Sequence, residues 1–192
     1  MRRPALLHGL LLAGLAALPA RAAPASYRLD PEATFAWFEV VHFRTSTLRG
    51  RFGPLQGVAT FDAAAGTGEV AIEVDTATVD SGMAPFDVRL RRPDLLASED
   101  YPKAWFVARR WRFDAQGLPA EVRGEFTLRG VSQPLSLIAD RFACRAGADG
   151  GPEVCGGDFH AEFRRSSFGM TFGLPFVADH VRLLVRVEGV RQ

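Results

Sequence analysis

The chain has 192 residues, of which 47% are hydrophobic and 23% charged, and its formal net charge is +1. This apolar content is enough to build a sizeable core, which excludes an intrinsically disordered protein, and the length suits one ordinary domain. The 23 basic residues are scattered among 22 acidic ones, so the sequence lacks the concentrated basic patch of a nucleic-acid-binding protein.

The first segment has the pattern of a secretory signal peptide. Arg2 and Arg3 precede an apolar run over 5–18, and Ala20-Arg21-Ala22 is a typical cleavage site. A transmembrane anchor is disfavoured because the run is shorter than the ~20 residues that span a bilayer. We predict a signal peptide over 1–22, with cleavage after Ala25 as the alternative, and one domain over 23–192. Cleavage after Ala22 removes three basic residues and no acidic one. This leaves 20 basic and 22 acidic residues, and a net charge of −2.

The two cysteines fit an exported protein. Cys144 and Cys155 flank a glycine-rich stretch and are expected to pair in an oxidising compartment, where the bond stabilises the fold by about 3 kcal/mol. The alternative, a metal or redox pair, lacks the C-x-x-C spacing and further ligands.

Alternation of apolar and polar residues predicts strands with one buried face. Turn signals rich in glycine and aspartate separate them, and together they predict an all-β, eight-stranded antiparallel barrel or a sandwich. The expected strands cover 35–42, 52–61, 69–74, 104–113, 121–128, 135–139, 159–164 and 181–188.

One stretch, 85–98, has helical spacing in two short pieces, the second beginning at Pro93. Its apolar face would consist of Phe86, Leu90, Leu95 and Leu96. We expect a short helical cover between the third and fourth strands.

Motifs for catalysis and metal binding are weak. Gly66-Thr-Gly68-Glu-Val-Ala71 matches a dinucleotide pattern but opens a strand, so we interpret it as a turn. His160 is expected to be solvated, and His180, which follows Asp179 just before the last strand, is expected to lie at a rim. His42 shares the apolar face of its strand, where a polar ring needs a hydrogen-bond partner or the polar part of a ligand. We predict no metal site and no cofactor.

Two groups of arginines have different expected roles. Arg89, Arg91 and Arg92 are interpreted as a solvated face of the helical cover. Arg165 opens a turn that includes an aromatic residue, and a charge buried at a barrel mouth must be paired. Asp87 and Asp179 are the candidate partners.

At this point the motifs resemble those of YceI-like proteins, in order along the whole mature chain. The resemblance rests on six segments, which are Tyr27-Arg-Leu-Asp30-Pro31 with Phe38-x-Val40-x-His42, Gly50-x-Phe52 with 57–62, Tyr101-Pro102-x-x-x-Phe106, 124–134, Arg165-Ser166-Ser167-Phe168-Gly169-Met170, and 177–183. It implies a lipocalin-like, eight-stranded antiparallel barrel with an elongated apolar cavity. It also implies binding of a long isoprenoid without catalysis or metal, and, for exported bacterial members, a periplasmic location.

The chain departs from the family's motifs at polar positions. Ala33-Thr34 stands where the family has His-Ser, 86–90 lacks the family's arginine and histidine, and Ser167 replaces an acid. These departures leave the preference for a ligand headgroup open.

The sequence therefore favours a non-catalytic periplasmic carrier for a polyisoprenoid, an isoprenoid quinone or a similar lipid. Transient contact with a membrane or a respiratory protein is compatible with this role, and the oligomeric state stays open, with a homodimer among the options. The predicted ligand-binding residues are Phe38, Val40, His42, Phe52, Ile72, Asp87, Phe106, Phe126, Leu137, Arg165, Phe168, Met170 and Val185.

Three alternatives remain. An outer-membrane barrel would have its charged residues on the lipid face, which is costly. A lipid-acting enzyme would use His42 with Asp87 or Arg165. A barrel filled by its own side chains, 15 phenylalanines among them, would be an interaction module without a ligand.

Overall fold

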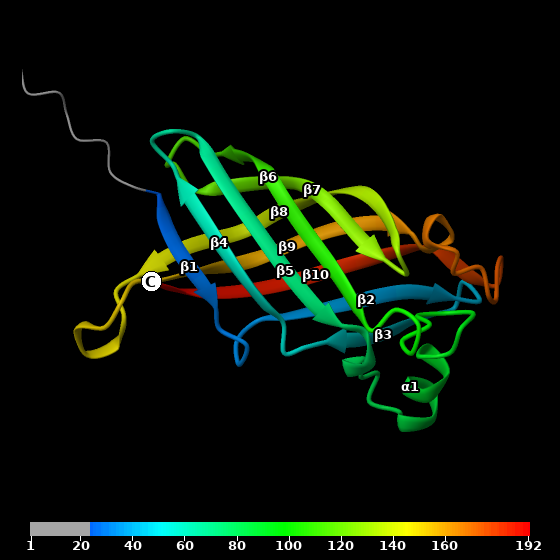
Figure 1. Cartoon of the computed structure of the whole chain (residues 1–192). Helices are drawn as coiled ribbons and strands as arrows, with labels where there is room; N and C mark the ends of the chain where they lie inside the picture. Colours follow the sequence, from blue (N-terminus) through cyan, green and yellow to red (C-terminus); the bar gives the residue numbers. More distant parts are fainter. Residues whose placement is uncertain (1–23) are drawn as a thin grey trace, which may run out of the picture.

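A computed structural model describes residues 24–192, so the predicted signal peptide over 1–22 lies outside the described residues. Ten strands form one antiparallel sheet that closes through pairing of its first and eighth members, β1 and β10 (Figure 1). The strands are β1 (Ala25–Leu29), β2 (Phe35–His42), β3 (Ser46–Phe52), β4 (Gln56–Asp62), β5 (Thr67–Asp75), β6 (Lys103–Phe113), β7 (Pro119–Leu128), β8 (Val131–Arg145), β9 (Val154–Arg164) and β10 (Val177–Arg191). The helical segments are η1 (Thr76–Thr78), α1 (Ala84–Leu90), η2 (Ala148–Gly150) and η3 (Arg165–Phe168).

The ten segments make eight barrel strands, as predicted, because two of these strands are interrupted. Both β1 and β2 pair with β10, and they are the two halves of one strand broken at 30–34. Their partners β4 and β3 are likewise halves of one strand broken at 53–55. The buried Thr34 bridges the first break, since its hydroxyl donates to the carbonyl of Glu188 and accepts from the amide of Glu188, both at 3.2 Å. A hydroxyl residue at this position thus replaces ladder hydrogen bonds that the interrupted strand lacks.

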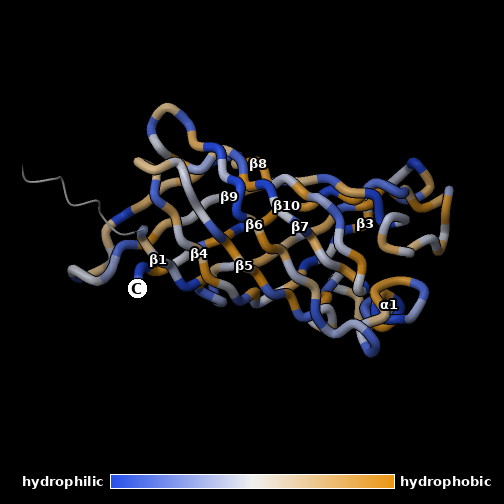
Figure 2. Tube along the Cα trace, turned by 45° about the horizontal axis from the view of Figure 1, so that its top comes forward, coloured by the Kyte–Doolittle hydropathy of each residue, from blue (hydrophilic) through white to orange (hydrophobic). Residues whose placement is uncertain are grey.

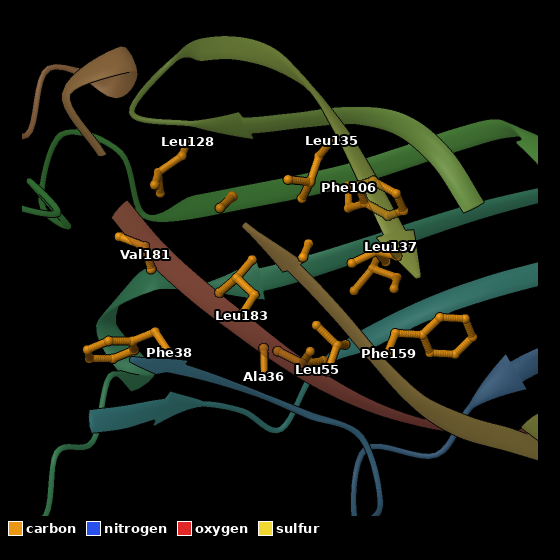
Figure 3. Close-up of a cluster of buried hydrophobic side chains, with 14 of the residues drawn as sticks. Ala36, Phe38, Leu55, Phe106, Leu128, Leu135, Leu137, Phe159, Val181 and Leu183 are labelled. Carbon is orange, nitrogen blue, oxygen red and sulfur yellow. The ribbon is translucent and has the colours of Figure 1, made fainter. Parts of the chain in front are cut away.

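The barrel wall alternates as the sequence predicts, with apolar side chains inward and charged ones outward. Figure 2 shows hydrophobic and hydrophilic residues following one another along the strands. Figure 3 shows inward side chains such as Phe38, Phe106 and Leu183 converging from different strands. A glycine allows one close approach inside the wall. A Cβ on Gly50 would lie 2.5 Å from the ring of Phe38, so this ring packs directly on the β3 backbone.

The helical cover is shorter than predicted. Helix α1 lies between β5 and β6, the predicted third and fourth strands, but 93–98 forms turns instead of a second helix. Arg129, in the β7–β8 turn, donates to the carbonyls of Pro93 and Leu95. Ala97 has a left-handed φ of 49°. The carbonyls that a helix would use internally are therefore bound from outside, and the chain turns back at Ala97.

The predicted disulfide between Cys144 and Cys155 is confirmed, and it joins paired residues of β8 and β9. Among residues 24–192, the only cluster with metal-ligand geometry is these two cysteines with Glu153. Because the sulfurs are bonded to each other, they offer no thiolate to a metal. No helix within 24–192 is long and apolar enough to cross a bilayer.

A carboxylate on the outer wall gives a pH-dependent contribution to stability. Glu121 is 6% exposed and lies between Arg112 and Arg123, whose Nε atoms are 3.3 and 2.7 Å from its oxygens. Hydrogen bonds from Arg123 above all lower the pKa of Glu121 from 4.5 to about 2. Since the folded-state pKa is depressed, the stabilisation is complete above pH ~4.5 and is lost as the pH falls through about 2.

We therefore expect Glu121→Gln to lower the free energy of unfolding at pH 7, and this difference from the wild type to vanish between pH 4.5 and 2. Urea titrations at several pH values measure it. Glu125→Gln, at an exposed position of the same strand, serves as the control and is expected to show no such pH dependence. A difference for Glu121→Gln that stays constant down to pH 2 would contradict this account.

Candidate functional site

A cavity of about 270 Å³ occupies the barrel at the end covered by α1. Its walls come from the inward faces of β2, β3, β5–β10 and from the cover, including Leu90, Leu95 and Leu96. The interior is therefore not filled by its own side chains. Phe172, which lines the cavity and is 52% exposed, marks the mouth.

Eleven of the thirteen predicted ligand-binding residues line this cavity. They are Phe38, Val40, His42, Phe52, Ile72, Phe106, Phe126, Leu137, Arg165, Met170 and Val185. Two others do not line it. Asp87 faces Ser81, whose amide and hydroxyl donate to its carboxylate at 2.7 and 2.5 Å. Phe168 is 2% exposed and packs behind the wall, edge-on to Phe126 and Phe163.

Sequence reasoning missed several lining residues, for two reasons. Val181 and Leu183 lie on the same face of β10 as Val185, so the alternation of this strand already pointed to them. Leu48 was missed because its strand, β3, was not predicted, and Phe172 because its loop has no periodicity.

Arg165 is buried at the mouth, and its partners differ from the predicted ones. Its guanidinium donates to four backbone carbonyls, those of Met170, Phe172, Val177 and Ala178, at 2.7–2.9 Å. Burial lowers the pKa of Arg165, while the charge of nearby Asp179 acts in the opposite direction.

The two proposed acidic partners of Arg165 are engaged elsewhere. Asp179 accepts hydrogen bonds from the amide and hydroxyl of Ser166, and Asp87 accepts them from Ser81. Neither carboxylate is hydrogen-bonded to Arg165, and of the two only Asp179 acts on it, through its nearby charge. Arg165 instead holds the 170–178 segment in place around the mouth.

Arg89 also differs from its predicted solvated role. Its guanidinium makes a two-point ion pair with Asp94, at 2.6 Å for each hydrogen bond, and lies 4.0 Å from the centre of the Phe172 ring. The hydrogen bonds with Asp94 raise the pKa of Arg89. This cation–π contact joins the cover to the 170–178 segment across the mouth.

Polar groups in the cavity wall are few, and most are already satisfied. Thr76 donates to the carbonyl of Tyr101, and the two arginines have the partners described above. His42 is half-buried at the rim of the cavity, and within residues 24–192 its ring makes no hydrogen bond. His160, by contrast, contacts Asp140 at 2.8 Å on the outer wall, and His180 is exposed. His42 is thus the polar group that is free to meet a ligand.

A smaller cavity of about 60 Å³ lies deeper in the barrel. Ile72 and Leu137 line both cavities and separate them. The indole nitrogen of Trp111 points into a buried region there and has no hydrogen-bond partner in the described part of the chain.

Comparison with known proteins identifies the same architecture. Residues 27–189 match the family model of the YceI-like domain. The chain is 30% identical to "Protein YceI" of Escherichia coli O17:K52:H18 over 189 residues, which cover 97% of each chain. The fold is shared with the Campylobacter jejuni YceI protein, at a TM-score of 0.66 and 22% identity over 79% of this chain and 89% of that one. It is also shared with a polyisoprenoid binding domain from Saccharophagus degradans, at a TM-score of 0.64 and 17% identity over 86% of this chain and 98% of that one.

Proposed function

The chain belongs to the YceI-like family, and from this we propose that it is a non-catalytic periplasmic carrier that holds a polyisoprenoid, an isoprenoid quinone or a similar long apolar lipid in its barrel. The observation that carries the proposal is the composition of the cavity wall, in which Thr76, Arg89 and Arg165 satisfy their polar groups within the protein. Such a wall selects an apolar molecule by shape, because a ligand with many polar groups would lose its hydrogen bonds with water and find no replacements.

The dimensions favour a slender ligand. At about 270 Å³ the cavity lies near the lower limit of ~300 Å³ for typical ligand sites. Part of a long chain is enough to fill this cavity. Each CH₂ group that is buried there contributes up to ~0.8 kcal/mol to the free energy of binding. Its far end is directed past Ile72 and Leu137 toward the smaller cavity, and its polar end toward His42 at the rim.

Two features support export to the periplasm. The disulfide between Cys144 and Cys155 is typical of proteins in oxidising compartments, and the sequence of 1–22 has the pattern of a cleaved signal. The role as a carrier entails contact with the membrane that supplies the lipid.

Mass spectrometry of an organic extract from protein purified out of the periplasm without detergent tests the proposal. We expect one long isoprenoid or quinone at close to one equivalent. A blank extract, together with failure to bind added geranylgeraniol, would overturn the carrier role. Recovery of a chemically altered form of the added lipid would overturn its non-catalytic character.

A further inference from the structure

Two aromatic rings stand exposed beside the cavity mouth without lining the cavity. Phe43, in the β2–β3 turn, is 55% exposed, and Phe176, just before β10, is 62% exposed. Their rings stack with centroids 5.4 Å apart, and the amide of Phe43 donates to the carbonyl of Phe176 at 2.7 Å. Because neither ring lines the cavity or belongs to the core, neither cargo binding nor packing accounts for them.

The turn that presents Phe43 adopts a conformation that its residues disfavour. Phe43 and Arg44 have left-handed φ values of 49° and 59°, and the amide of Thr45 bonds to the carbonyl of His42. Asn-Gly is the preferred pair where two successive residues have positive φ, because a large side chain is strained there. Strained residues of this kind cluster at functional sites, so the Phe-Arg pair points to a role outside folding.

The two segments that carry the rings contain no acidic residue. Segment 40–48 contains no acid, and its only charged side chain is the exposed Arg44. Segment 166–178, which carries Phe172 and Phe176, has no ionisable side chain. On the neighbouring cover, Asp94 is paired with Arg89, while Arg92 is exposed. The two loops that carry the rings thus combine exposed aromatic side chains with one exposed positive charge, that of Arg44.

This combination is typical of surfaces that insert shallowly into an anionic lipid bilayer, where aromatic rings lie at the headgroup level and arginines contact anionic lipids. Two apolar side chains of the cover are also exposed, Met83 at the N-cap of α1 (53%) and Val88 on the helix (56%). The β2–β3 turn and the 170–178 segment both lie at the mouth end, away from the disulfide loop and the C-terminus (Figure 1).

We propose that the mouth of the barrel docks on the surface of an anionic bilayer through Phe43, Phe176 and Arg44. This inference rests on the proposed carrier function and adds which face of the protein meets the membrane. Docking by the mouth lets an apolar cargo pass between bilayer and cavity without crossing water, which its exposed apolar area would make costly.

Flotation with vesicles tests the docking face on the mature chain. We expect wild-type protein to bind vesicles of 25% phosphatidylglycerol in phosphatidylcholine about fivefold better than pure phosphatidylcholine vesicles. Phe43→Asn with Phe176→Ser is expected to reduce binding about tenfold or more, because both rings leave the bilayer while asparagine suits the left-handed turn. Arg44→Glu is expected to abolish the preference for phosphatidylglycerol.

The matched control is Val58→Ser with Val107→Ser, which removes two side chains of similar exposure (51% and 45%) from the outer wall on β4 and β6. It is expected to bind vesicles like the wild type. Equal binding by the aromatic double variant and the wild type would overturn the docking face. A concentration-dependent dimer that the same double variant abolishes, without vesicle binding, would assign the rings to a second copy of the chain instead.

Extraction of the bound lipid from the same samples separates this inference from the proposed function. Wild-type protein that carries lipid but binds neither kind of vesicle overturns the docking and leaves the carrier role intact. Vesicle binding by protein that never yields lipid overturns the carrier role and supports the docking face alone.

Discussion

Arg165→Met is expected to lower the free energy of unfolding by about 3–5 kcal/mol, because several buried carbonyls lose their hydrogen-bond donor. Arg165 is 4% exposed, and its guanidinium donates to four backbone carbonyls. Methionine keeps the apolar stem but leaves those carbonyls without donors, and each buried, unsatisfied group costs about 1–3 kcal/mol. The carbonyls of Phe172 and Val177 lie nearer the surface, so water replaces part of the hydrogen bonding that they lose. The total cost is therefore lower than that of four fully unsatisfied carbonyls.

Guanidinium titrations followed by circular dichroism measure this effect. Arg164→Met is the matched control, since Arg164 is the preceding residue, is 64% exposed at its side chain and has only a 3.8 Å contact with Asp179. It is expected to change the free energy of unfolding by less than about 0.5 kcal/mol. Arg165→Lys should fall between the two, because an ammonium offers three donors and lacks the planar fork of arginine. If the free energy of unfolding of Arg165→Met lies within about 1 kcal/mol of the wild-type value, the hydrogen bonds from Arg165 to the four carbonyls do not stabilise the 170–178 segment.

The hydrogen-bond partners of Arg165 are a feature that the sequence does not predict. Its burial was predictable in part, because an arginine in an apolar, turn-like segment must find acceptors. The acceptors are main-chain carbonyls, which every residue has, so no pattern of side chains identifies them. The sequence offered Asp87 and Asp179 as carboxylate partners, and the structure places them with Ser81 and Ser166.

The strands illustrate the opposite case. Alternation is a local property of the chain, so it located the inward positions of β2 and of β5–β10 correctly. Short strands with mixed composition, β1 and β3, carry too little alternation to be recognised. The break at 30–34 depends on pairing with β10, more than 140 residues away, as the Thr34–Glu188 hydrogen bonds show, and local periodicity contains no information about it.

The cover shows a third limit. Its apolar residues Phe86, Leu90, Leu95 and Leu96 were identified from helical spacing, and all four line the cavity. The second half nevertheless forms turns, because Arg129 from a distant hairpin takes the carbonyls of Pro93 and Leu95. Tertiary hydrogen bonds thus override a weak helical preference while the inward face is kept.

Ala36→Phe is expected to reduce the lipid recovered with the protein to less than about one tenth of the wild-type amount. Ala36 lies on β2, is 8% exposed and lines the cavity, where Figure 3 shows it on the inner wall with Leu55 and Leu183. A benzyl ring there takes up much of the 270 Å³ that the cargo needs. Since the ring enters empty space, the cost to stability should lie near the lower end of the ~1–3 kcal/mol typical of overpacking.

The same substitution on the outside of the barrel is the control. Ala71 is exposed on β5, so Ala71→Phe should keep its full lipid content. Ala104→Leu, a smaller insertion on the cavity wall of β6, gives a second test if Ala36→Phe folds poorly. Wild-type lipid levels in a folded Ala36→Phe protein would place the cargo outside this cavity. Because Ala36 is remote from the exposed rings of Phe43 and Phe176, an emptied Ala36→Phe barrel should still bind anionic vesicles, whereas the aromatic double variant should carry lipid and fail to bind them. This crossed pattern would assign lipid binding to the cavity and membrane docking to the loops at its mouth.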